Sequence, residues 1–180
     1  FVRGAAAGFA SFAVAALLGS LAPLFLVQVL GETSRTLAGL VVFILFGVSI
    51  AGQLAVRRVS ERRALVWGCA LLVCGIGLLA LALVIDSLAS LIASSIAVGV
   101  GQGLAIGAGL AAINQRAPVE RRGETASSFF VVLYVGLSVP VVGAGVAAHE
   151  FGLRTAGLAF SAAVGVLVLV ILASLARARD

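Results

Sequence analysis

Charged residues are absent from six long stretches of this sequence, and this pattern limits the possible folds more than any other feature. Each uncharged stretch is longer than 20 residues. A helix of about 20 apolar residues crosses a hydrocarbon core of roughly 30 Å, whereas the strands of a membrane barrel are about ten residues long and alternate in polarity. The sequence therefore predicts an all-α, multi-pass membrane protein with six transmembrane helices, at about residues 5–30, 37–56, 64–85, 88–114, 125–148 and 155–176.

The composition excludes a soluble globular domain. Hydrophobic residues make up 62% of the chain and charged residues 11%, whereas roughly half of a soluble domain is apolar. The net charge of +5 comes from arginines that are confined to the ends of the chain and the short connections between the stretches. We therefore expect these arginines to orient the chain in a lipid bilayer, and we expect no nucleic-acid partner.

The short connections also predict the topology. They force successive helices to run antiparallel, so alternate connections lie on opposite sides of the bilayer. One side then collects ten arginines, at positions 3, 57, 58, 62, 63, 116, 121, 122, 177 and 179, and the other side has only Arg35 and Arg154. By the positive-inside rule, both ends of the chain are expected to be cytoplasmic, in the cytoplasmic or inner membrane of the cell.

Several functional classes lack support in the residues. Cys69 and Cys74 share one apolar stretch without a nearby histidine or acid, so we expect buried structural thiols and no metal site. Two GxGxxA strings, at 75–80 and 107–112, follow no predicted strand and have no acid about 20 residues further on. No hydrolase or phosphate-binding motif appears. We therefore expect neither an enzyme nor a cofactor.

An internal repeat is suggested by identities at a constant offset. Val42, Gly47 and Ser49 recur 89 positions later, as Val131, Gly136 and Ser138. Two halves, at about 1–90 and 91–180, would form a 3+3 inverted repeat, which is an arrangement that builds alternating-access transporters. Apolar sequences also produce short matches by chance, so the sequence leaves the repeat and a coincidence open. The chain begins at Phe1 and contains no methionine, and we expect it to be a piece of a longer polypeptide.

Glycines and prolines predict details of the helices. In the fourth stretch, small residues form two stripes, Gly99 to Gly107 and Gly101 to Gly109, each with a spacing of four. Such stripes favour close helix packing over contact with a ligand. Pro23 and Pro140 lack an amide hydrogen, so we expect the first and fifth helices to bend at these positions.

Neutral polar residues near the middle of the membrane are the candidates for solute contact. They are Ser20, Gln102, Tyr134 and Ser138. An unpaired amide such as that of Gln102 is costly at this depth, so it must meet another helix, water or a solute. The stripe of Tyr134 and Ser138 either lines a cavity or bonds to a neighbouring helix. No acid lies within the six stretches, so a proton-binding carboxylate is expected outside this segment.

The connection between the second and third helices resembles the signature loop of the major facilitator superfamily. The resemblance rests on Gly52-Gln53-Leu54-Ala55, Arg57 and Arg62-Arg63-Ala64-Leu65. Val56 stands where the family usually has aspartate, and Arg58 is an extra residue. The resemblance implies the carboxy-terminal six-helix half of such a transporter. Gly136, Pro140 and Gly143 are also similar to the glycine-proline motif of drug/proton antiporters.

This resemblance implies alternating-access transport of a small solute, with proton-coupled efflux of drug-like or apolar compounds as the first hypothesis. The implied partners are a solute, protons, the lipid bilayer and an amino-terminal six-helix bundle of the same chain. A nutrient or sugar importer, and a membrane module that anchors or assembles without transport, remain alternatives. Because the aspartate is missing, the loop of Gly52, Arg57, Arg58, Glu61, Arg62 and Arg63 is interpreted as an orientation signal rather than a gating latch. Glu61 is expected to pair with Arg57 or Arg58.

Overall fold

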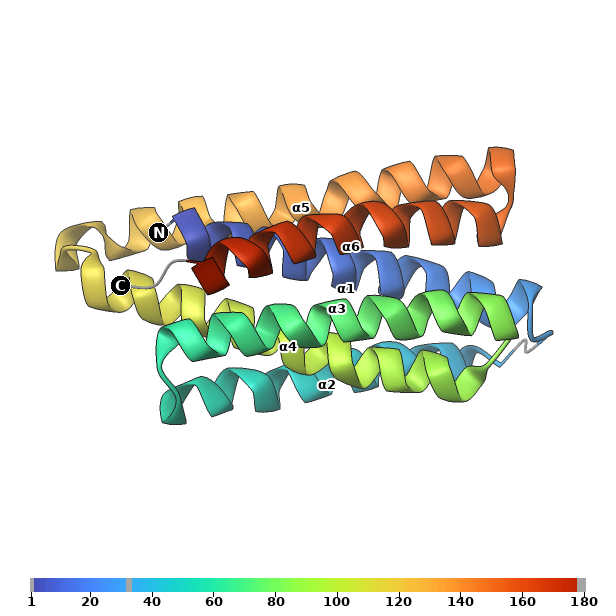
Figure 1. Cartoon of the computed structure of the whole chain (residues 1–180), viewed down its shortest axis with the longest axis horizontal. Coiled ribbons are helices and arrows are strands. Elements are labelled where there is room, and N and C mark those ends of the chain that lie inside the picture. Colours follow the sequence, from blue (N-terminus) through green and yellow to red (C-terminus); the bar gives the residue numbers. More distant parts are fainter. Residues whose placement is uncertain (1, 32–33, 178–180) are drawn as a thin grey trace.

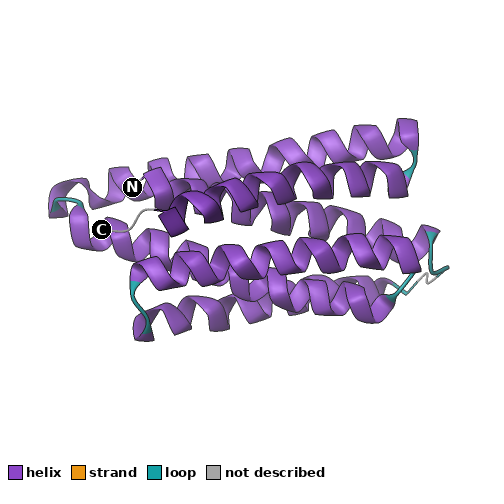
Figure 2. Cartoon of the chain, in the orientation of Figure 1, coloured by secondary structure: helices purple, strands orange, loops and turns teal. Residues whose placement is uncertain are grey.

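Six long helices make up the fold, as the uncharged stretches predict (Figures 1 and 2). The computed structural model describes residues 2–31 and 34–177, without the side chains of Val2 and Arg3. All six helices are long and apolar enough to cross a membrane. Their bounds are Val2–Gln28 (α1), Arg35–Ala55 (α2), Glu61–Ile85 (α3), Leu88–Arg116 (α4), Arg122–Phe151 (α5) and Leu153–Arg177 (α6), with short 3-10 turns η1 (Val56–Arg58) and η2 (Val119–Arg121).

Charged residues enter the helix ends, so the helices do not stop where the uncharged stretches stop. Helix α3 already begins at Glu61, after Ser60 as its N-cap, and α5 begins at Arg122. Charged side chains in a first or last turn still reach water while their backbone stays helical. The uncharged stretches therefore predict the apolar middle of each helix better than they predict its ends.

The helices pack as a row of four with two more helices on one side. Helix α2 packs mainly on α4, α4 contacts α1, and α5 packs mainly on α1, while α3 and α6 lie against each other and cover α4 and α1. These contacts are related in pairs when α1 is equated with α4, α2 with α5 and α3 with α6. The contact of α2 with α4 then corresponds to the contact of α5 with α1. This correspondence is the contact pattern expected of a 3+3 repeat.

A glycine lies at each of these two corresponding contacts, Gly52 where α2 meets α4 and Gly136 where α5 meets α1. An added Cβ at Gly52 would lie 2.6 Å from the carbonyl oxygen of Val100, and one at Gly136 would lie 2.6 Å from that of Phe9. Gly47, which matches Gly136 in the 89-residue offset, would meet only Phe43 of its own helix. Similarly, Ser49 is buried and Ser138 is exposed. The helices therefore pair alike, but the residues matched by that offset do not occupy equivalent places.

The two glycine stripes of α4 are confirmed as packing surfaces. A Cβ at Gly99 would lie 2.3 Å from the carbonyl oxygen of Leu45, and one at Gly103 would lie 2.1 Å from that of Ser49, so this stripe faces α2. On the next stripe, a Cβ at Gly101 would lie 2.8 Å from the carbonyl oxygen of Gly68 in α3. Only residues without a side chain allow the backbones of α2, α3 and α4 to approach so closely.

One end of the bundle collects the first turn of α1, the last turn of α6 and the α2–α3 and α4–α5 connections (Figure 1). We call it the arginine-rich end and define it by residues 56–63, 116–122 and Arg177. The side chain of Arg3 and the whole of Arg179 lie outside the described residues. At the opposite end, the Arg154 guanidinium donates to both carboxylate oxygens of Asp86, which joins α6 to the turn between α3 and α4.

Two expectations about individual side chains are wrong. Glu61 pairs with Arg116, with Nη2 and Oε2 3.1 Å apart, and not with Arg57 or Arg58. The reason is that Glu61 belongs to the first turn of α3, beside the last turn of α4. Cys69 is buried as expected, but Cys74 is exposed on the surface of α3. Helices α1 and α5 continue without interruption through Pro23 and Pro140, and bending there stays a prediction.

Candidate functional site

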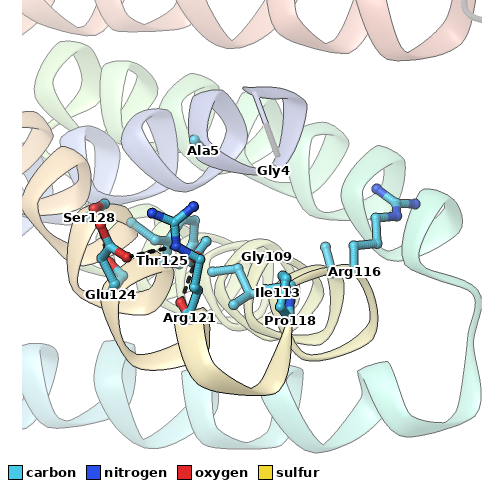
Figure 3. A pocket seen from close by; sticks show the side chains of 13 residues that line it. Gly4, Ala5, Gly109, Ile113, Arg116, Pro118, Arg121, Glu124, Thr125 and Ser128 are labelled. Carbon is cyan, nitrogen blue, oxygen red and sulfur yellow. Dashed lines mark hydrogen bonds and ion pairs between the residues drawn. The ribbon is translucent and has the colours of Figure 1, made fainter.

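A cavity of about 480 Å³ opens at the arginine-rich end, between the start of α1, the end of α4 and the start of α5 (Figure 3). Its volume exceeds that of a hollow of about 320 Å³ at the start of α3. The chain positions that form the cavity are far apart in the sequence and come together only through packing. Its lining consists of Gly4, Ala5, Gly109, Ala112, Ile113, Arg116, Ala117, Pro118, Arg121, Glu124, Thr125, Ser128 and Phe129.

The inner wall of the cavity is apolar and fixed by close packing. Ala5, Ile113 and Phe129 belong to one buried cluster. An added Cβ at Gly109 would lie 2.5 Å from the Phe129 ring, and one at Gly4 would lie 3.5 Å from Cα of Gly109. Small residues therefore bring α1 and α4 together beside Phe129. The cavity lies beside the short loop that connects α4 and α5.

The rim of the cavity is polar. Arg121 Nε and Glu124 Oε2 lie 3.4 Å apart and are both exposed. Thr125 Oγ1 donates to the carbonyl oxygen of Arg121 at 2.9 Å, and Ser128 Oγ donates to that of Glu124 at 3.0 Å. These hydroxyl hydrogens are occupied, but the oxygens can still accept a hydrogen bond. An apolar wall with a charged and polar rim suits a small amphipathic molecule.

Arg116 lines the cavity, and its guanidinium pairs with Glu61 of α3. Figure 3 shows its side chain pointing away from Arg121 and Glu124. The following loop is held by Arg122, whose Nε donates to the carbonyl oxygen of Ala117 at 3.3 Å. Arg116 is therefore attached to α3, and the α4–α5 connection is attached to the first residue of α5.

None of the four solute-contact candidates lines this cavity. Gln102 is 2% exposed, and its Oε1 has no hydrogen-bond partner among the described residues. Ser20 is half-buried, and its hydroxyl donates to Leu17 of the same helix at 3.0 Å. The roles of both residues in solute contact stay predictions.

Tyr134 and Ser138 are brought together on the exposed face of α5. Tyr134 is 60% exposed, and the Ser138 hydroxyl donates to its carbonyl oxygen at 2.9 Å. The Tyr134 ring meets Phe12 of α1 edge to face, with ring centroids 6.2 Å apart. This face therefore extends from α5 onto α1 and is open to whatever covers the bundle.

Within the signature-like loop, Gly52 and Val56 have packing roles. Val56 is only 9% exposed, and its Cγ2 would lie 2.9 Å from a Cβ at Gly107. The usual aspartate would place a carboxylate against α4 at this position, which explains why an apolar residue fits here. Arg57 and Arg58 are exposed in η1, and Arg62 and Arg63 are exposed in the first turn of α3.

The polar rim was not predicted from the sequence. Arg121, Glu124, Thr125 and Ser128 have the spacing i, i+3, i+4 and i+7, which places them on one face at the start of α5. This spacing was the available signal. The spacing is hard to recognise because these residues lie at the boundary of an uncharged stretch. Charged residues at such a boundary are also expected from the orientation of the chain in the membrane alone.

A family model described as Major Facilitator Superfamily matches residues 4–180, which is nearly the whole chain. No curated protein matches this sequence.

Proposed function

Because this chain belongs to the Major Facilitator Superfamily, a family of secondary transporters without enzymatic activity, we propose that it is the carboxy-terminal half of a proton-coupled exporter of small, largely apolar compounds. The other half would be an amino-terminal bundle of six helices. The observation that carries the proposal is the amphipathic cavity between α1, α4 and α5 at the arginine-rich end.

The distribution of the arginines supports a direction of transport. Of the described arginines, only Arg35 and Arg154 lie away from the arginine-rich end. The positive-inside rule then makes this end cytoplasmic, in the cytoplasmic or inner membrane. A cavity at this end would collect compounds from the cytoplasm or the inner leaflet, as an exporter requires. An importer of the same fold would release its solute there instead.

The class of solute follows from the wall and the rim. The wall of Ala5, Ile113 and Phe129 offers burial to an apolar body, and the paired charges of Arg121 and Glu124 balance each other. A strongly charged solute would have to separate this pair, whereas a neutral or weakly polar one can accept or donate single hydrogen bonds. The mutual neutralisation of these two charges favours drug-like apolar compounds over charged nutrients as the solute.

Ser20, Tyr134 and Ser138 are proposed to continue the path along the open face of α1 and α5, toward the second bundle. Gln102 lies deeper, and its unpartnered oxygen costs about 1–3 kcal/mol if no donor reaches it. A donor from solute or water would recover this energy when α1 and α4 move apart. Because a donor from the solute would recover this free energy, Gln102 is included in the proposed path.

The proton-binding group is proposed to lie in the other bundle. The acids that the structure describes are all at or near the ends of helices, namely Glu61, Asp86, Glu120, Glu124 and Glu150. A carboxylate that couples proton flow to transport is normally found within the membrane. The segment described here would then supply the solute path and respond to protonation elsewhere.

Cysteine labelling in the complete polypeptide tests the path. In a background with Cys69 and Cys74 replaced by serine, cysteines at positions 102, 128 and 134 are each treated with a small aqueous thiol reagent, with and without an apolar dye. We expect labelling at 128 and 134 that the dye slows, and slower labelling at 102. Cysteine at Val170, exposed on α6 at membrane depth, is the matched control and should not react. Inert cysteines at 102, 128 and 134 would contradict the proposed path.

A further inference from the structure

A second, smaller hollow lies where α3 begins and α6 ends. Figure 1 shows both of these helix ends at the arginine-rich end of the bundle. The volume of this hollow is about 320 Å³, and it is lined by Ser60, Arg62, Arg63, Val66, Trp67 and Ala176. We call it the α3–α6 groove. It shares no lining residue with the cavity between α1, α4 and α5.

The α3–α6 groove has an excess of positive charge. Arg62 and Arg63 both line it, whereas the neighbouring acid, Glu61, is engaged by Arg116 of α4. No acid that the structure describes forms an ion pair with Arg62 or Arg63. The charges of these two arginines are therefore available to an anion from outside the described chain.

The start of α3 adds donors beside these arginines. Ser60 is the N-cap residue and one of the residues that line the groove, and its side chain makes no capping hydrogen bond. The first amide groups of a helix have no acceptor within the helix, and the helix dipole favours negative charge there. Two guanidinium groups, a hydroxyl and a helix N-terminus together form a suitable set of donors for phosphate oxygens.

The groove becomes apolar one helical turn further into the membrane. Val66 and Trp67 follow Arg62 and Arg63 at a spacing of four, and Trp67 is 64% exposed. Tryptophan is enriched where the headgroups meet the hydrocarbon, because its ring is both apolar and able to donate a hydrogen bond. The groove therefore offers donors for a phosphate at its outer end and an apolar wall for an acyl chain at its inner end.

We propose that the α3–α6 groove binds an anionic membrane phospholipid. Its phosphate lies against Arg62 and Arg63 at the start of α3, and an acyl chain runs along Val66 and Trp67. Free phosphate in water would gain the same donors but nothing from the apolar wall. Each arginine in a basic cluster beside a transmembrane helix raises the association constant for an anionic lipid by about fivefold.

Trp67 gives a direct readout, because it is the one tryptophan in this sequence. The protein is reconstituted into phosphatidylcholine vesicles that contain either brominated phosphatidylglycerol or brominated phosphatidylcholine at equal mole fraction. Bromine quenches tryptophan on contact, and a Trp67→Phe sample supplies the background emission. We expect the anionic lipid to quench Trp67 more strongly. We also expect Arg62→Gln with Arg63→Gln to lower its relative association constant by about fivefold for each residue.

Controls separate a lipid site from its rivals. Arg121→Gln removes a charge at the same end but outside the groove, and it should leave the preference intact. An equal loss in Arg121→Gln would mean that general surface charge attracts the lipid, and it would overturn the proposal. Loss of the preference on adding inorganic phosphate would indicate a simple anion site and overturn it as well. The unmodified protein suffices if the variants misfold, because equal quenching by the two lipids would also refute the proposal.

Discussion

Glu61 and Arg116 join the first turn of α3 to the last turn of α4, with Oε2 and Nη2 3.1 Å apart. The Glu61 side chain is largely buried, while that of Arg116 remains mostly in solvent. The pair also draws the Arg116 guanidinium away from the rim of the cavity between α1, α4 and α5. It therefore connects the signature-like loop with the wall of the candidate site.

A double-mutant cycle on this pair should give a small coupling. We expect Glu61→Gln and Arg116→Gln each to lower the free energy of unfolding, with a coupling of about 0.2–1 kcal/mol because much of the pair is exposed to water. Denaturant titration in detergent micelles measures it. Arg58→Gln is the control, since Arg58 is one of the two partners that the sequence suggested. Coupling of Glu61 to Arg58 instead of Arg116 would contradict the described contact.

Close packing of α2 on α4 predicts a strong effect of one methyl group. Gly103→Ala places a Cβ 2.1 Å from the carbonyl oxygen of Ser49, so the helices must separate. We expect a loss of about 1–3 kcal/mol in the free energy of unfolding. Gly77→Ala is the matched control, because a Cβ there meets nothing within 4 Å. That substitution should be neutral or stabilise α3 by up to about 1 kcal/mol, and similar losses in both variants would argue against the α2–α4 interface.

Restoring the usual aspartate of the signature loop should harm this protein. Val56→Asp puts a carboxyl group against Gly107 of α4, in a nearly buried position. We expect a cost of about 1–3 kcal/mol, seen as a lower midpoint in the same titration. Val59→Asp, at an exposed position of the same loop, should change stability by no more than about 0.5 kcal/mol. A stabilised Val56→Asp variant would mean that the loop retains the geometry of a gating latch.

The sequence was sufficient to predict the number, approximate positions and alternation of the helices. Uncharged stretches of this length predict membrane-spanning helices. Small residues spaced by four, such as Gly99 and Gly103, predict where two helices pack closely. These signals are local in the sequence. They depend on the bilayer and on helix geometry, and not on which distant residues meet.

The cavity and the ion pairs could not be predicted in the same way. Ala5, Ile113 and Phe129 meet only because α1 packs against both α4 and α5, and Glu61 finds Arg116 across two helices. Polarity placed Gln102 at mid-membrane depth but did not reveal that the residue turns inward. The depth of a residue in the membrane follows from its position along the helix. The direction in which its side chain points, toward the protein interior or toward lipid, depends on how all the neighbouring helices pack.

The most direct test of the proposed exporter is transport by the complete polypeptide in proteoliposomes with an imposed pH gradient. A small apolar fluorescent dye should move against its gradient when protons flow the opposite way, and Phe129→Ala should reduce this movement by removing the wall of the cavity. Collapse of the pH gradient should abolish the movement. Dye movement equal to that in protein-free liposomes, or unaffected by the gradient, would contradict the account.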